Sequence, residues 1–221
     1  MKKVSLVNVT LNAANPMTKY LLTKDPEIHV MNYLDSSLMD NVRRDGKITD
    51  ESMGRILAML TKACVDGSDG IILTCTVFSP YVNIFRKIFS IPIVSPDTAM
   101  LEKAAKKGGK TAILCTFPAT VDSSLQLYNG FLEQSGVEAQ VVTYLLEDAY
   151  IAAQKQNMDE HNRIIQKKVK EIEANYDTVV LAQISMAGAA NGLENCKAEV
   201  LTSPASAYYS LVEQMKLGEK K

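Results

Sequence analysis

The sequence has few of the residues that build metal centres and disulfide frameworks. It contains two histidines and four cysteines, and no cysteine forms a CxxC pair or a metal-type spacing with a histidine. We therefore expect no metal site. Free thiols in a chain without an evident export signal are typical of a reducing compartment, so the expected location is cytoplasmic.

The sequence also lacks a charge excess and a long apolar run. Lys plus Arg number 24 and Asp plus Glu number 25, a balance that gives no reason to expect nucleic acid or anionic lipid as a partner. No run approaches the ~20 apolar residues that cross a membrane. Unlike a signal peptide, the apolar start of the chain is interrupted at Asn8, Asn12 and Asn15, and no small-residue cleavage site follows.

Short β-branched apolar runs alternate with longer segments of helical composition. The clearest runs are residues 4–9, 28–33, 70–73, 111–114, 140–143 and 178–181. Runs that are apolar throughout, such as 71–73 and 179–181, are typical of parallel strands buried on both faces. Amphipathic or capped helical segments begin near Thr49, at Asp97, and at Asn157 or Asp159. The pattern predicts an α/β fold of parallel sheets flanked by helices.

An internal repeat divides the chain into two halves. Residues 69–75 resemble 177–183, residues 93–96 resemble 201–204, and residues 2–9 resemble 110–117, each pair separated by 108 positions. A constant offset over separated blocks indicates a duplicated half. We predict an N-terminal half at 1–108 and a C-terminal half at 109–221, related by a pseudo-two-fold axis.

Polar residues follow the first and third predicted strands of each half. In parallel α/β sheets, ligands bind outside the carboxyl ends of the strands. The residues expected there are Asn8, Thr10, Thr74, Cys75 and Thr76 in the first half, and Thr116, Thr120 and Gln183 in the second. We expect one ligand cleft between the halves, with Cys75 on one wall and Gln183 on the other. No GxGxxG segment follows the first strand, so no dinucleotide cofactor is expected.

Cys75 is the leading candidate for chemistry. It lies where a buried strand gives way to a predicted helix, and the positive end of a helix lowers a thiol pKa. The alternative is a buried structural cysteine, which is common for this residue type. Cys115 ends an apolar strand and is interpreted as a core thiol. Cys64, inside an amphipathic helical segment, is also interpreted as a core thiol, and Cys196 as an incidental loop thiol.

Together these segments resemble the aspartate/glutamate racemase superfamily, which includes hydantoin racemases, maleate isomerases and arylmalonate decarboxylases. The resemblance covers nearly the whole chain and rests on residues 69–80, 91–92 with 97–105, 112–120, 179–187 and 201–204. It implies pseudo-symmetric α/β halves, a small carboxylate substrate between them and a homodimer. It also implies chemistry that needs neither pyridoxal phosphate nor a metal.

The resemblance assigns roles to particular residues. In the two-cysteine racemases one thiolate removes the α-proton while the opposite thiol delivers a proton to the other face. Cys75 matches the first of these cysteines. Thr76, Thr116 and Thr120 match carboxylate-binding positions, and Asn8 is expected on the same wall.

The second cysteine position is Gln183 in this chain. A glutamine amide is neither a usable acid nor a usable base near neutral pH. Ser185 is close in sequence, but a serine hydroxyl is a poor proton donor without an activating partner. The sequence therefore departs from the pattern that two-thiol racemisation requires.

Three interpretations stay open. The first is a one-cysteine enzyme of isomerase or lyase type, in which Cys75 acts and Gln183 orients the substrate. The second is a racemase whose second proton donor is Ser185 or a bound water. The third is a protein that binds a carboxylate without turnover. A reactive thiolate at Cys75 favours the first two, because a binding protein has no need of one.

Overall fold

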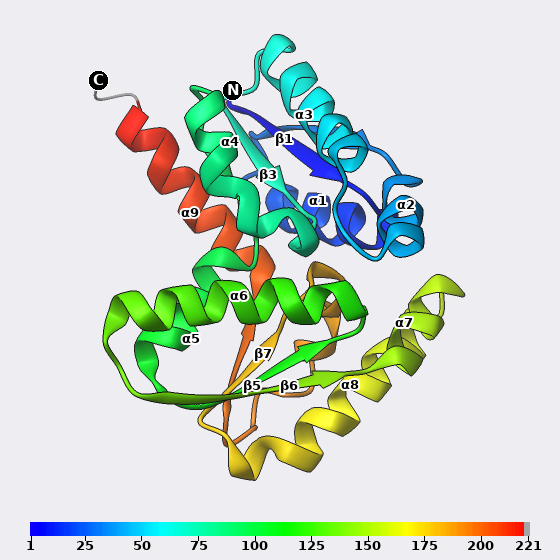
Figure 1. Cartoon of the computed structure of the whole chain (residues 1–221), viewed down its shortest axis with the longest axis vertical. Helices are drawn as coiled ribbons and strands as arrows, with labels where there is room; N and C mark the ends of the chain where they lie inside the picture. Colours follow the sequence, from blue (N-terminus) through cyan, green and yellow to red (C-terminus); the bar gives the residue numbers. More distant parts are fainter. Residues whose placement is uncertain (219–221) are drawn as a thin grey trace. The chain divides into compact units, whose positions relative to one another are not determined.

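The computed structural model describes residues 1–218 and contains two four-stranded parallel sheets (Figure 1). The first holds β1 (Lys3–Asn8), β2 (His29–Leu34), β3 (Gly70–Leu73) and β4 (Ile93–Val94), in the order β2-β1-β3-β4. The second holds β5 (Gly109–Cys115), β6 (Ala139–Leu145), β7 (Thr178–Leu181) and β8 (Glu199–Thr202), in the order β6-β5-β7-β8. Helices flank both sheets, and the predicted α/β class is confirmed.

The helices connect successive strands. The α-helices are α1 (Leu11–Lys24), α2 (Leu38–Asp45), α3 (Asp50–Val65), α4 (Val82–Ile88), α5 (Thr98–Lys107), α6 (Pro118–Ser135), α7 (Glu147–Gln154), α8 (Met158–Ile172) and α9 (Ser203–Gly218). The 3-10 helices among residues 1–218 are η1 (Thr76–Tyr81), η2 (Glu173–Asn175) and η3 (Ile184–Ala190). Helix α3 begins at the predicted cap, where Thr49 Oγ1 accepts a hydrogen bond from Ser52 N. Helix α8 begins after Asn157, the first of its two predicted start points.

Both faces of the second sheet are covered, which explains its uninterrupted apolar strands. Along β5, Ala112 and Leu114 belong to a core cluster with residues of α8 and η3. Ile113 and Cys115 belong to another cluster with residues of α5 and α6. Successive strand residues point to opposite faces, so each face receives every second side chain.

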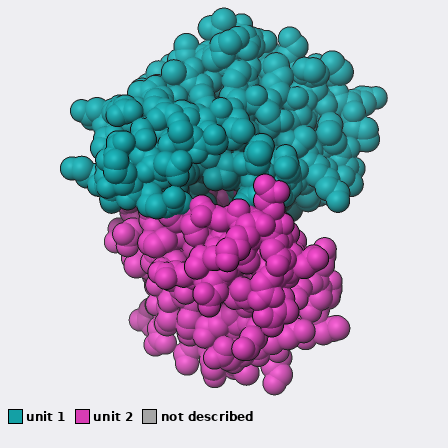
Figure 2. Space-filling model, turned by 90° about the vertical axis from the view of Figure 1, so that its right-hand side faces the viewer, with its two compact units in different colours: residues 1–96, 204–221 teal, residues 97–203 magenta. Residues whose placement is uncertain are grey.

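The chain forms two compact units (Figure 2). Unit 1 is residues 1–96 with the segment from 204, and unit 2 is residues 97–203. These units differ from the predicted halves, because α5 belongs to unit 2 and most of α9 to unit 1. The last residues of the predicted second half, 219–221, lie outside the described part of the chain.

Helices α5 and α9 each belong to the unit in which their apolar side chains are buried. Met100, Leu101, Ala104 and Ala105 of α5 pack in the core cluster of the second sheet. In unit 1, α9 lies so close to β3 that a Cβ placed on Gly70 would be 2.8 Å from Leu211 Cδ1. The apolar face of each helix thus assigns it to a unit, and a boundary drawn from the repeat could not show this.

The pairing of strands corrects the constant offset of 108. Val4 of β1 pairs with Gly70 of β3, whereas Thr111 of β5 pairs with Thr178 of β7. The third strands therefore keep the offset of 108, but the first strands match at an offset of one less. At that offset the counterpart of Cys115 is Asn8 rather than Val7. The difference matters because a one-residue slip moves a side chain to the other face of a sheet.

One backbone device is repeated in the two sheets. Asp69 Oδ2 accepts a hydrogen bond from Lys3 N at 2.7 Å, and Asp177 Oδ2 accepts one from Lys110 N at 2.8 Å. Each aspartate immediately precedes the third strand of its sheet and satisfies an amide at the start of the first. The repeated aspartates therefore join the amino ends of neighbouring strands.

Replacement of Gly109 by alanine is expected to destabilise the protein by about 2 kcal/mol. Gly109 has φ +73°, and a Cβ there would lie 2.5 Å from Asp177 Oδ2, the oxygen that accepts from Lys110 N. Alanine would thus combine backbone strain with displacement of that carboxylate. Urea unfolding followed by circular dichroism measures the difference.

Gly130→Ala is the matched control. Gly130 lies inside α6, and a Cβ there would meet no atom within 4 Å. Since alanine is the better helix former, this variant is expected to be as stable as the parent or more stable. Equal stability of the Gly109 variant and the parent would contradict the strain assigned to Gly109.

Candidate functional site

The first candidate residues lie at the carboxyl ends of β1 and β3 in unit 1. Cys75 directly follows β3, and its side chain is 5% exposed. Its Sγ lies 3.8 Å from Met39 Sδ of α2, a contact that a weak S–H donor can make. The segment after Cys75 is the six-residue 3-10 helix η1 rather than the expected α-helix, and α4 follows it.

Asn8 is engaged inside the sheet rather than open to a ligand. Its side chain is fully buried, and Nδ2 donates to Leu6 O at 3.1 Å and to Asn32 Oδ1 at 3.0 Å. Its Oδ1 accepts from Thr74 Oγ1 at 2.8 Å. Asn8 therefore links β1 and β2 to Thr74, the residue that precedes Cys75.

The hydroxyls of the first unit have simpler surroundings. Thr10 is the N-cap of α1, where Oγ1 accepts from Ala13 N at 3.3 Å. Thr10 and Thr76 are both half-buried, and Thr76 is the first residue of η1. A capping hydroxyl keeps its own proton available to a second acceptor, so Thr10 can still donate.

In unit 2 the carboxyl ends of β5 and β7 are joined by Thr116 and Gln183. Gln183 Oε1 accepts from Thr116 N at 2.6 Å and from Thr116 Oγ1 at 2.9 Å. Thr116 is 2% exposed, while Gln183 is half-buried. Both hydrogen-bond donors of Thr116 are therefore occupied by Gln183, although the sequence suggested that Thr116 would bind a carboxylate.

Thr120 and Ser185 complete the predicted set. Thr120 lies in the first turn of α6, is nearly buried, and donates its backbone N–H to Phe117 O at 3.0 Å. Ser185 is half-buried in η3, two residues after Gln183. Unit 2 thus brings Thr116, Thr120 and Gln183 to the strand ends, with Ser185 on the segment that leaves them.

The pKa values of the other three thiols are raised. Burial raises the pKa of Cys115 to about 12, with the nearby Ser124 side chain acting against it and the charge of Asp97 adding to it. Cys115 is fully buried, which confirms its interpretation as a core thiol. Burial and a contact with Glu173 raise the pKa of Cys196 to about 11, and burial also raises the pKa of the half-buried Cys64.

The two histidines have different surroundings. His29 is exposed on β2. His161 is fully buried in α8, where Nδ1 contacts Ala149 O at 2.8 Å. This contact ties the His161 ring to a backbone carbonyl of α7.

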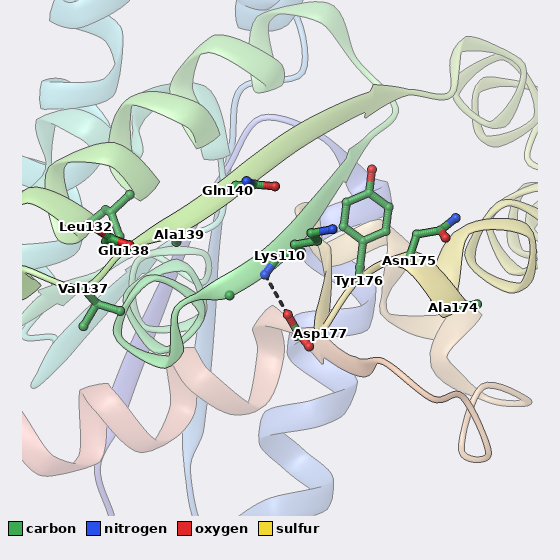
Figure 3. A pocket seen from close by; sticks show the side chains of 11 residues that line it. Lys110, Leu132, Val137, Glu138, Ala139, Gln140, Ala174, Asn175, Tyr176 and Asp177 are labelled. Carbon is green, nitrogen blue, oxygen red and sulfur yellow. Dashed lines mark hydrogen bonds between the residues drawn. The ribbon is translucent and has the colours of Figure 1, made fainter.

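Unit 2 also has a broad pocket of about 860 Å³ (Figure 3). Its lining includes Gly109 and Lys110 at the start of β5, Gln140 near the start of β6, and Asp177 just before β7. The pocket is therefore at the amino ends of these strands, whereas Thr116 and Gln183 are at the carboxyl ends. Figure 3 shows Asp177 bonded to the backbone of Lys110, the device described above.

Within residues 1–218, no group of three or more His, Cys, Asp or Glu side chains is placed to hold a metal ion. No helix in this part of the chain is long and apolar enough to span a membrane.

Parallel α/β units with thiol, hydroxyl and amide groups at their carboxyl strand ends are typical of proteins that bind small molecules there. A model of the Asp/Glu/hydantoin racemase family matches residues 7–208. The chain therefore belongs to the Asp/Glu/hydantoin racemase family. A search of curated proteins by sequence gives no match.

Solved structures of racemases have a similar fold. Aspartate racemase of Picrophilus torridus is 14% identical, with a TM-score of 0.76 over 98% of this chain and 95% of that chain. Allantoin racemase of Klebsiella pneumoniae is 13% identical, with a TM-score of 0.73 over 99% and 89%. An aspartate racemase homologue from Pyrococcus horikoshii is 18% identical, with a TM-score of 0.67 over 98% and 100%. At these identities the likeness is one of fold.

Proposed function

We propose that this protein is a cofactor-independent isomerase that acts on a small carboxylate, such as an amino or dicarboxylic acid, through Cys75. The observation that carries this proposal is the position of Cys75, directly after the central strand β3 of a racemase-family chain. The side chain is nearly buried but not sealed, and the bond between Asn8 and Thr74 fixes the residue before it.

The proposed chemistry is proton transfer at carbon. The Cys75 thiolate removes the α-proton of the bound acid, and the electron pair moves into the adjacent carboxylate to give a carbanion-like intermediate. Hydrogen-bond donors such as Thr76, Thr120 and the amide of Gln183 would stabilise the charge that develops on the carboxylate. Return of the proton by Cys75 to the same face of the same carbon gives only exchange, whereas its delivery to another carbon of an unsaturated acid gives an isomer. Loss of carbon dioxide in place of proton removal would give lyase chemistry.

Two alternatives lead to different observations. A racemase with Ser185 or a water as second acid would invert the substrate at the rate at which it exchanges the α-proton. A carboxylate-binding protein without turnover would bind the acid and exchange nothing. That one ligand contacts the candidate residues of both units, that the protein is a homodimer, and that it is cytoplasmic all stay predictions.

The proposal is tested by incubating the protein in D₂O with separate enantiomers of aspartate, glutamate, methylsuccinate and 5-methylhydantoin. Proton NMR follows loss of the α-proton signal, and chiral chromatography follows the enantiomer. We expect exchange of at least one acid, with little inversion. The absence of exchange across this panel, in a protein that binds one of its members, would favour the binding alternative.

A further inference from the structure

We infer that Gln183 is a fixed hydrogen-bond donor for the ligand carboxylate and that Thr116 is the residue that positions it. The chemical class of the ligand rests on the proposed function. The orientation of the Gln183 amide rests on contacts within unit 2 alone. That orientation determines that the side chain presents its NH₂ group to a ligand.

The orientation of the Gln183 amide follows from its partner. The backbone N–H of Thr116 can only donate, and it lies 2.6 Å from the Gln183 side chain. The atom facing it must therefore be the carbonyl Oε1 and not the NH₂ group. The Thr116 hydroxyl donates a second hydrogen bond to the same oxygen, at 2.9 Å.

The partner is itself held rigidly. Thr116 directly follows β5 and is 2% exposed. The ends of β5 and β7 are joined by the pairing of Leu114 with Leu181 and by a hydrogen bond of 3.0 Å from Ala182 N to Leu114 O. Two bonds from one buried residue to one oxygen leave the amide little freedom to rotate.

The other end of the amide is open. Both hydrogen bonds of the Gln183 side chain use Oε1, and among the described residues none accepts a hydrogen bond from Nε2. The residue is half-buried, so an unpaired donor there is accessible to a ligand. An NH₂ group held in place by its own carbonyl suits an oxygen anion and cannot accept a proton from carbon.

The test uses succinate as the probe and the ¹⁵N-resolved side-chain amide signal of Gln183 as the readout. Titration up to about 50 mM succinate saturates a site with a Kd of ~1 mM. We expect the Gln183 signal, assigned by its loss in Gln183→Glu, to shift with succinate and not with neutral succinamide. An unshifted Gln183 signal across the titration would overturn the inference.

Variants separate the donor from its positioning residue. Gln183→Glu keeps the shape but replaces the donor with an anion, so succinate affinity should fall about 10- to 100-fold. Gln140→Glu makes the same change of charge on an exposed residue at the other end of the sheet and should alter affinity less than about 2-fold. Thr116→Val keeps the backbone donor and should cost about 3- to 10-fold, with Thr116→Ser restoring affinity and the signal.

Binding is measured without turnover, so the inference and the proposed function fail separately. If succinate shifts the Gln183 signal but no acid exchanges its α-proton, catalysis is disproved and the inference holds. If exchange occurs while Gln183→Glu binds succinate as the parent does, the inference is overturned and the catalytic proposal holds.

Discussion

Replacement of Cys75 by serine is expected to slow α-proton exchange at least about 10³-fold, within the range that acid–base groups contribute. Serine is close to cysteine in size and keeps a hydrogen-bond donor at the same position, but its hydroxyl does not ionise near neutral pH. A thiolate is the species that can take a proton from carbon. The initial rate of deuterium incorporation in the NMR assay gives the comparison directly.

Cys64→Ser is the matched control for this prediction. Cys64 lies in α3 of the same unit and is half-buried, and burial raises its thiol pKa. Its replacement should leave exchange within about 3-fold of the parent, because surface and half-buried substitutions of this size have small effects. If Cys75→Ser retained more than about a tenth of the parent rate while folded by circular dichroism, Cys75 would not be the base.

Replacement of Gln183 by cysteine is expected to raise the rate of inversion at least about 10²-fold over the parent. The resemblance to two-cysteine racemases implies that Gln183 takes the place of the second thiol. The parent amide neither gives nor takes a proton there, so a new thiol would supply the missing donor. Chiral chromatography of single enantiomers measures the inverted product, and deuterium incorporation measures exchange in the same sample.

Gln183→Ser separates the new thiol from the loss of the amide. It removes the same contact with Thr116 and adds no acid of suitable pKa, so inversion should stay at the parent level. A parent protein that already inverts as fast as it exchanges would contradict this prediction. That result would assign the second proton donor to Ser185 or to a water.

Much of the fold follows from local patterns in the sequence. The apolar runs 70–73 and 178–181 become β3 and β7, fully buried at every position, because parallel strands covered on both faces need apolar side chains throughout. Helix α5 begins directly after Asp97, as predicted. Such signals are carried by a few neighbouring residues, so they can be interpreted without knowledge of the tertiary structure.

Two of the departures depend on contacts between segments that are distant in the sequence. The offset of the first strand changed by one because the pairing of β1 with β3 and of β5 with β7 decides register, and repeats in composition do not. The assignment of α5 and α9 to units depends on which sheet their apolar faces cover. After Cys75 the chain forms η1, although its composition gave no reason to expect a 3-10 helix rather than an α-helix.

For the candidate site, the positions of the residues could be predicted from the sequence, but their contacts could not. The residues expected at the carboxyl strand ends lie there, because the ends of parallel strands share an edge. Their hydrogen-bond partners were not predictable: Asn8 is bonded to Thr74, and Thr116 to Gln183, each pair more than sixty residues apart. Met39, which contacts Cys75, comes from α2 and has no local signal that marks it.

The most direct test of the role of Cys75 is its alkylation by iodoacetamide, followed by peptide mass mapping and compared with Cys115. At about pH 8 a thiol with a pKa of about 12 is almost wholly protonated, so Cys115 should stay unmodified until the pH rises well above 10. We expect Cys75 to react at least about 10-fold faster than Cys115 near neutral pH and to be protected by succinate. If Cys75 reacts as slowly as Cys115 and succinate does not change its rate, Cys75 is a structural thiol and the proposed active site is wrong.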